Sequence, residues 1–162
     1  MVEHVSHESL KPFVDKDSRI LILGSFPSVE SRKENFYYAH RTNRFFPVLA
    51  MVFEEETPLT TEERKEFLSR HHIALYDVIY ECDLEASKDS SVRNIVPSNI
   101  RELIKGTGIR HVITTGSLSD KLYKKYIGDD SIALPSTSAA NASYSMDKLF
   151  NEHKIIRELV SH

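Results

Sequence analysis

The sequence predicts an α/β fold of three layers, with helices on both faces of a central four-stranded, mainly parallel sheet. Short apolar runs of strand length alternate with longer segments in which apolar residues have helical spacing. Strands that alternate with helices usually lie parallel and are buried on both faces. The length of 162 residues suits one domain, so we expect a single domain over 1–162, with 1–17 as an N-terminal extension.

The first half of the chain predicts two strands and two helices. Residues 19–24 form a short apolar run that ends in glycine, as expected of a buried strand. A long connection over 24–42 precedes a segment with helical spacing at 43–53. The sequence Thr-Thr-Glu-Glu at the start of 60–70 is typical of a capped helix, and 73–79 alternates as a strand does.

The second half predicts the other elements. In chain order these are an irregular polar stretch at 81–96, a helix at 97–105, a strand at 111–116, a helix at 117–126, a short strand at 131–134, a polar loop at 135–143 and a helix at 145–160. Ligands of parallel sheets bind beyond the carboxyl ends of the strands. We therefore expect the loops after Gly24, Gly116 and Leu134 to lie at one edge of the sheet.

Composition predicts the surroundings of the protein. Hydrophobic residues make up 40% and charged residues 28%, and no run of about 18 apolar residues predicts a transmembrane helix. The N-terminal residues lack the apolar core of a secretory signal. Cys82 is the only cysteine, which excludes an internal disulfide or a four-cysteine iron–sulfur cluster and fits a reducing cytoplasm. We expect a cytoplasmic monomer without cofactor, metal or membrane contact.

The net charge of −3 neither supports nor excludes binding to DNA, because DNA-binding proteins show their basic character as a local patch. One stretch of the chain carries Arg32, Lys33, Arg41 and Arg44 against Glu34 alone. This stretch can form a basic face beside the first motif described below.

The first candidate segment is Gly24-Ser25-Phe26-Pro27-Ser28, directly after the first strand. The glycine lets the chain turn tightly, and backbone N–H groups of such a turn can point at an anion or at a base carbonyl. Phe36, Tyr37 and Tyr38 follow in a loop where no periodicity demands aromatic residues, which favours stacking on a flipped base. The alternative is that Phe36 and Tyr37 form a lid over the core.

The second candidate segment is Leu134-Pro-Ser-Thr-Ser-Ala-Ala-Asn-Ala142, after the last strand. Its serine hydroxyls and backbone amides can hold phosphates, whereas the alternative is an ordinary turn rich in serine and threonine. Asn43 and Arg44 stand at the expected start of a helix, where Asn43 either serves the site or only caps the helix.

Taken together, these segments resemble motifs one and two of the uracil-DNA glycosylase superfamily. The piece Ala39-His40-x-x-Asn43-Arg44-Phe45 is similar to the mismatch-specific uracil/thymine-DNA glycosylases. The pair GSFPS…FYYAH..NRFF with LPSTSAANA looks more like the hypoxanthine-DNA glycosylase branch, and so does the segment LYDVIYECDLEASKDSSVRNIVP. The resemblance runs from about Arg19 to the C-terminus and implies the fold of that family.

The family flips a damaged base out of duplex DNA and hydrolyses its N-glycosidic bond, so the resemblance implies damaged DNA as the partner. It implies that Asn43 is the catalytic residue, which orients water or supports the base. The base pocket would contain Gly24, Ser25, Phe26, Pro27 and Ser28, with Tyr38 as the stacking aromatic beside Phe36 and Tyr37. The DNA phosphates would be bound by Ser136, Ser138, Asn141 and Arg44.

The chain departs from the family pattern at several positions. The strongest members place an acidic residue where Phe26 stands, to steer the attacking water, and a histidine where Leu134 stands, to stabilise the departing base. The hypoxanthine branch also lacks that acid, which favours it here. Arg41 and Phe46 stand where the pattern more often has proline and tryptophan, and Arg41 either contacts a phosphate or faces water.

The first hypothesis is therefore a monofunctional DNA glycosylase of base-excision repair, with hypoxanthine as the first substrate and uracil or xanthine as others. Amides near Gly24 would stabilise charge on the departing base, and a water held by Asn43 would attack the sugar. One alternative is a glycosylase-fold protein that binds nucleic acid or nucleotide without cutting. The other is an unrelated α/β hydrolase or small-ligand binder.

Weaker candidates lie outside these motifs. Either Asp77 or Asp89 can face the pocket, although a solvated or capping role is the simpler expectation for each. His4, His7 and Glu8 have loose metal-ligand spacing, but their place in an N-terminal tail argues against a metal site.

Overall fold

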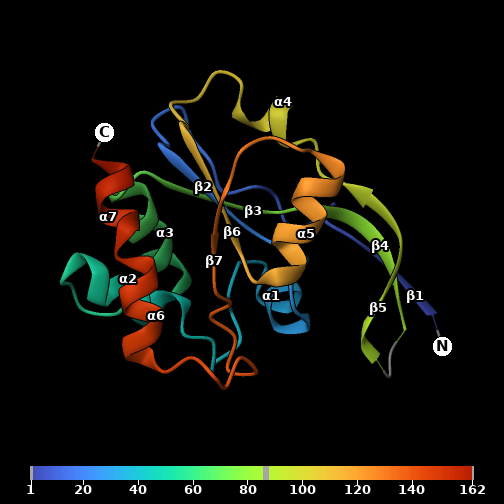
Figure 1. Ribbon diagram of the computed structural model, residues 1–162, viewed down its shortest axis with the longest axis horizontal. Coiled ribbons are helices and arrows are strands. Elements are labelled where there is room, and N and C mark those ends of the chain that lie inside the picture. The colour runs from blue at the N-terminus through green and yellow to red at the C-terminus, as the bar shows by residue number, and fades with distance from the viewer. Residues whose placement is uncertain (1, 86–87, 162) are drawn as a thin grey trace.

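The central element of the fold is a sheet of four parallel strands in the order β3-β2-β6-β7, which confirms the predicted fold class (Figure 1). The structure is a computed structural model that describes residues 2–85 and 88–161. The strands are β2 (Ile20–Gly24), β3 (Ile73–Asp77), β6 (His111–Thr115) and β7 (Ile132–Leu134). Because all four run the same way, their carboxyl ends lie at one edge of the sheet.

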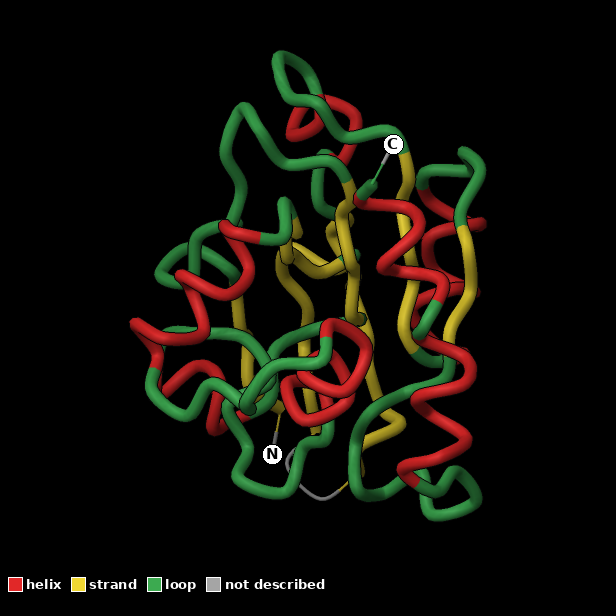
Figure 2. The backbone as a smooth tube through the Cα atoms, turned by 90° about the vertical axis from the view of Figure 1, so that its left-hand side faces the viewer, coloured by secondary structure: helices red, strands yellow, loops and turns green. Residues whose placement is uncertain are grey.

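Helices cover both faces of this sheet (Figures 1 and 2). One face carries α2 (Phe45–Phe53), α3 (Thr61–Arg70), α6 (Met146–His153) and α7 (Ile155–Val160). The other face carries α5 (Ser117–Tyr126). Two short helices complete the set, α1 (Val29–Glu34) after β2 and α4 (Ile100–Ile104) before β6.

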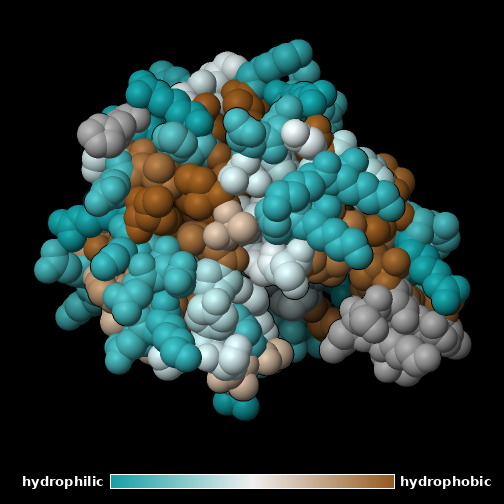
Figure 3. Space-filling model, in the orientation of Figure 1, coloured by the Kyte–Doolittle hydropathy of each residue, from teal (hydrophilic) through white to brown (hydrophobic). Residues whose placement is uncertain are grey.

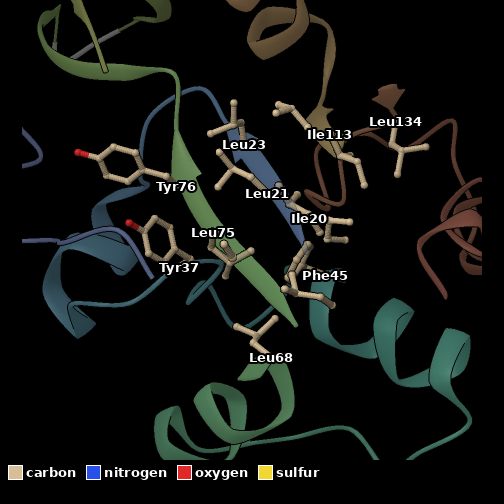
Figure 4. Packing of buried hydrophobic residues seen from close by; sticks show 14 of the residues in the cluster. Ile20, Leu21, Leu23, Tyr37, Phe45, Leu68, Leu75, Tyr76, Ile113 and Leu134 are labelled. Carbon is tan, nitrogen blue, oxygen red and sulfur yellow. The ribbon is translucent and has the colours of Figure 1, made fainter. Parts of the chain in front are cut away.

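The core is built around β2, one of the two central strands of the parallel sheet. Its residues Ile20, Leu21, Ile22 and Leu23 have no exposed surface, because both faces of the strand are covered (Figure 4). This run of consecutive apolar residues explains why the sequence predicted the strand so clearly.

A second sheet was not predicted. It is antiparallel, in the order β1-β4-β5, with β1 (Val2–Ser6), β4 (Ile79–Glu85) and β5 (Lys88–Pro97). The expectation of an irregular stretch at 81–96 was therefore wrong. The pairing of β4 with β5 contains several register shifts, which interrupt the alternation that identifies a strand in a sequence.

The N-terminal residues are tied to both sheets. Strand β1 pairs with β4, with Val5 opposite Cys82, and both of those side chains are buried. Further along, Phe13 and Leu75 exchange two backbone hydrogen bonds of 3.0 and 2.9 Å, which attach the segment to β3. Residues 2–17 thus contact β4 through β1 and β3 through Phe13.

Local signals explain most of the helix boundaries. Thr60 and Glu63 form the capping box that the sequence predicted for α3. The long connection 24–42 contains α1, which the sequence did not predict; Ser28 caps it and Asn35 ends it in the left-handed conformation. The predicted helix at 145–160 is divided at Lys154 into α6 and α7.

Within the described residues, no helix is both long enough and apolar enough to cross a membrane.

Candidate active site

A cavity of about 280 Å³ opens at the carboxyl edge of the parallel sheet. The loops after β2 and β7 both contribute to its wall, as the sequence predicted. The ends of β3 and β6 form the remaining side. The lining residues are Gly24, Ser25, Phe26, Pro27, Ser28, Ser31, Tyr37, Tyr38, His40, Asn43, Asp77, Thr115, Ser136, Thr137 and Ser138.

The turn after β2 is fixed by its carbonyl groups. The carbonyl oxygens of Gly24 and Ser25 accept hydrogen bonds from the N–H groups of Val78 and Ile79, at 2.9 and 3.0 Å. Gly24 does not have a positive φ, so the tight turn itself does not require glycine. A Cβ at this position would lie only 2.6 Å from Oδ1 of Asp77, so the close approach of Asp77 is what excludes any larger residue.

Tyr38 is held flat against the start of α2. Its ring stacks on Phe45 with centroids 3.8 Å apart and an angle of 11° between the planes. Its hydroxyl lies 3.4 Å from Oγ1 of Thr115, and Thr115 itself donates to the carbonyl oxygen of Leu23 at 3.3 Å. Burial raises the pKa of the Tyr38 phenol, so this group stays protonated at neutral pH. Tyr38 has a φ of 54°, a conformation that residues other than glycine rarely adopt.

Phe36 and Tyr37 belong largely to the core. Phe36 is 3% exposed, lies outside the cavity lining, and packs edge-on against Phe13 with ring centroids 5.6 Å apart. Tyr37 does line the cavity, but it is also 3% exposed and its hydroxyl donates to the carbonyl oxygen of Lys11 at 2.8 Å. Of the two, Phe36 therefore matches the alternative of a lid over the core.

Asn43 joins the two loops. Its Oδ1 accepts one hydrogen bond from the N–H of Phe45 and another from Oγ1 of Thr137, both at 2.9 Å. Because a backbone N–H can only donate, the atom that faces Phe45 must be the oxygen. Both lone pairs of that oxygen are used, so Asn43 can offer a ligand in the cavity only its side-chain N–H groups. The residue thus serves the helix start and still lines the cavity.

The loop after β7 is shaped by Arg44. The guanidinium donates to the carbonyl oxygens of Thr137 at 3.4 Å, Ser138 at 2.8 Å and Asn141 at 3.2 Å, and also to that of Tyr144. The structure therefore places Arg44 behind the loop, with its donors directed at the protein backbone. Such a fork of N–H groups fixes several carbonyls at once.

Three side chains of this loop were predicted to meet phosphates. Ser136 and Ser138 line the cavity, and each hydroxyl oxygen accepts a hydrogen bond from a backbone N–H two residues later, at 3.2 Å. Asn141 lies outside the lining and donates from Nδ2 to the carbonyl oxygen of Ser136 at 3.0 Å, so it braces the loop. The hydroxyl groups of both serines therefore still have their hydrogens to donate to a ligand.

Asp77 has a different place from the one that the sequence predicted. It ends β3, is 5% exposed and lines the cavity, which corrects the expectation of a solvated or capping role. His7 contacts it: Nε2 lies 2.8 Å from Oδ2 of Asp77, while Nδ1 lies 2.8 Å from the carbonyl oxygen of Leu10. The side chain of Asp89 lies outside the described residues.

His4, the other histidine considered as a metal ligand, makes contacts at the surface. His4 lies on β1, where its two ring nitrogens contact Asp83 at 2.8 Å and Glu81 at 3.2 Å on β4. These hydrogen bonds raise the pKa of His4. The N-terminal histidines therefore have separate roles, since only His7 reaches the cavity wall.

Of the predicted basic stretch, some side chains make contacts within the protein and others are exposed. Arg32 lies 3.8 Å from the carboxylate of Glu3 and 5.8 Å from the ring centre of Phe26. Arg41 and Lys33 are exposed and line a separate depression, which shares His40 with the cavity. Phe26 and Leu134, which stand where the family pattern has an acid and a histidine, lie in different surroundings. Phe26 lines the cavity, whereas Leu134 is buried beside a separate apolar groove along β7, α6 and α7 (Figure 3).

Comparisons with known proteins agree with this geometry. A family model described as the Uracil DNA glycosylase superfamily matches residues 11–160. A hypoxanthine DNA glycosylase from Methanosarcina barkeri (strain Fusaro / DSM 804) is 31% identical over 88 residues, which are 54% of this chain and 56% of that protein. A hypoxanthine DNA glycosylase from Methanosarcina acetivorans is 27% identical over 141 residues, which are 83% of this chain and 88% of that protein.

The fold has a solved counterpart. A solution NMR structure from Methanosarcina acetivorans, of a protein described as a candidate uracil DNA glycosylase, superposes with a TM-score of 0.81 at 25% identity and covers 100% of both chains. The fold and site define an α/β protein with a cavity between the loops after β2 and β7. The chain belongs to the Uracil DNA glycosylase superfamily.

Proposed function

We propose that the protein is a monofunctional DNA glycosylase that excises deaminated bases, with hypoxanthine as its main substrate. The observation that supports this most is the convergence of two loops, about a hundred residues apart in the chain, on one small polar cavity through Asn43 and Thr137. A volume of about 280 Å³ lies just below the range of pockets for larger ligands and suits a single base. The names of both Methanosarcina relatives point to hypoxanthine.

The residues of the cavity and its rim have separate roles in binding DNA. The extruded base enters between the loops, where the aromatic faces of Tyr38 and Phe26 limit its position. Ser136 and Ser138 bind the flanking phosphates, and Arg44 acts by holding their loop in shape. Arg41 adds a charge at the rim that approaches the DNA backbone.

Catalysis depends on stabilising the departing base. As the glycosidic bond stretches, negative charge gathers on the base and positive charge on the sugar. The N–H groups of Asn43 and the backbone amides after Gly24 then donate to the base, where fixed donors lower the barrier most. This use of Asn43 as a donor follows from its saturated Oδ1 and refines the expectation that it holds the attacking water.

An oligonucleotide panel tests this function. Duplexes and single strands that carry one deoxyinosine, deoxyuridine or deoxyxanthosine are incubated with the protein and then treated with alkali, which breaks the strand at an abasic site. We expect strand breaks at deoxyinosine and intact strands for an undamaged control. Equal absence of breaks at all three lesions would contradict the proposal.

The rival function, binding without cutting, is favoured by one observation: an apolar Phe26 stands where the family's strongest members have an acid. The same panel separates the two functions. Tight binding to lesion-containing duplexes without strand breaks would support the binding protein, and strand breaks would exclude it.

A further inference from the structure

The buried pair of His7 and Asp77 is a feature of the cavity wall that the proposed mechanism does not use. Both side chains are almost fully buried, with side-chain exposures of 0% and 7%. The two residues come from segments that are 70 positions apart. A carboxylate and an imidazole buried together at a ligand cavity are costly unless their protons and partners are matched.

The hydrogen bonds of His7 determine how many protons the pair holds. The carbonyl oxygen of Leu10 can only accept, so Nδ1 of His7 must carry a hydrogen. The 2.8 Å contact between Nε2 and Oδ2 of Asp77 then requires one further proton between these two atoms. That proton lies either on nitrogen, which gives an ion pair, or on oxygen, which gives two neutral groups. In both cases the pair as a whole has no net charge.

The second oxygen of Asp77 has the same role in both cases. Since the shared proton lies between Nε2 of His7 and Oδ2 of Asp77, Oδ1 keeps its lone pairs and remains an acceptor. Oδ1 points toward Gly24, where it lies 2.6 Å from the position that a Cβ would take, and both residues line the cavity. The wall therefore presents a hydrogen-bond acceptor that does not change when the proton moves.

We infer that His7 is a positioning residue of the base pocket, which fixes Asp77 so that its Oδ1 accepts the ring N–H of a deaminated base. Deamination of adenine or cytosine replaces an amine and a bare ring nitrogen by a carbonyl and a ring N–H. A fixed acceptor binds the ring N–H of the deaminated form and repels the bare ring nitrogen of adenine or cytosine. This inference rests on the proposed function and names the group that selects its substrates.

The neutrality of the pair matters for the reaction as well. An isolated carboxylate beside the cavity would oppose the negative charge that gathers on the departing base. Because His7 supplies the compensating proton, Oδ1 of Asp77 accepts a hydrogen bond from the base and the wall gains no net charge. The N-terminal segment is thereby a working part of the site.

Four variants test the inference. Asp77→Ala removes the acceptor, and His7→Phe removes the group that holds it. Asp77→Asn is the conservative variant: its Nδ2 donates to Nε2 of a neutral His7, which leaves Oδ1 as an acceptor toward the cavity. His4→Asn is the matched control. Like His7, His4 is an N-terminal histidine that contacts carboxylates, but its partners lie on β4 and it lies outside the cavity.

Two measurements are made on each variant and on the wild type, after thermal melting has shown that the variants fold. One is single-turnover excision from a deoxyinosine duplex. The other compares affinity for a duplex with non-cleavable 2′-fluoro-deoxyinosine and for a duplex with a tetrahydrofuran abasic analogue, which has no base. We expect Asp77→Ala and His7→Phe to lose about tenfold to a hundredfold in excision and in affinity for the inosine analogue.

Affinity for the abasic analogue should stay near the wild-type value in every variant, and His4→Asn should resemble the wild type throughout. Asp77→Asn, which keeps the acceptor, should recover most of the excision rate and affinity that Asp77→Ala loses. Wild-type behaviour of Asp77→Ala and His7→Phe would overturn the inference. So would equal loss of affinity for both duplexes, since that result indicates a structural role only. If the wild-type protein excises no lesion, the proposed function itself fails, which is a distinguishable outcome.

Discussion

Gly24 is constrained by its neighbour and not by its own backbone conformation. Its φ is not positive, yet Oδ1 of Asp77 occupies the space next to its Cα. The carboxylate cannot withdraw easily, because Oδ2 is bound to His7 inside the protein. The sequence suggested a glycine for the turn, and the structure gives a different physical reason for the same residue.

Replacing Gly24 by alanine should therefore destabilise the protein by about 1–3 kcal/mol, the usual cost of forcing an extra group into a packed site. The measurement is chemical denaturation of the wild type, Gly24→Ala, Asp77→Ala and the double variant. The alanine at position 24 should cost clearly less when Asp77 is already alanine, because the clash is then absent.

Equal costs in the two backgrounds would show that the carboxylate is not what excludes the methyl group. Unchanged stability of Gly24→Ala alone would contradict the close approach itself.

At the scale of elements, the loop after β7 depends on a residue of a distant segment. Arg44 lies directly before α2 and binds carbonyl groups between Thr137 and Tyr144. These hydrogen bonds hold the loop that carries Ser136 and Ser138 against the start of α2. If the proposed function holds, Arg44 therefore affects DNA binding through the shape of the loop.

Arg44→Lys keeps the charge but loses the planar fork, so we expect a loss of about 1–3 kcal/mol in stability and weaker binding to duplex DNA. Arg44→Met removes the charge as well, and the slope of log affinity against log salt should stay at the wild-type value in this variant if Arg44 does not meet a phosphate. Arg41→Ala is the control at the exposed rim: its stability should not change, whereas the slope of log affinity against log salt should fall by about one.

A smaller salt slope in Arg44→Met, with unchanged stability, would instead assign Arg44 to the phosphates directly.

Elements with strong local signals were predictable, and those determined by distant contacts were not. The capping box of Thr60 fixed the start of α3, and apolar runs fixed β2 and β6. The hairpin of β4 and β5 was missed because register shifts interrupt its alternation. The same holds for the residues of the site. Asn43 and the two serines lie in recognisable motifs and were predictable, whereas His7 contacts Asp77 only because β1 pairs with β4.

At the scale of the whole molecule, the two sheets together build the cavity. The parallel sheet supplies its edge, and the antiparallel sheet places the N-terminal segment against Asp77. Asn43 and Thr137 then close the ring of contacts by joining the loops after β2 and β7. The central claim is that this junction also carries the catalytic donor, the side-chain amide of Asn43.

The measurement that tests this claim most directly is single-turnover excision of hypoxanthine by Asn43→Asp. Aspartate keeps an oxygen for the N–H of Phe45 and for Thr137, but it replaces the N–H donors by a second acceptor. Thr137→Val is the control, because it breaks the junction and leaves the amide of Asn43 intact. Affinity for a duplex with an abasic analogue is measured in parallel.

Loss of a donor aimed at developing charge typically lowers the rate about a hundredfold to a thousandfold, so Asn43→Asp should lose that much while binding the abasic duplex normally. Thr137→Val should lose considerably less. Excision by Asn43→Asp at the wild-type rate, or an equal loss in both variants, would contradict the account.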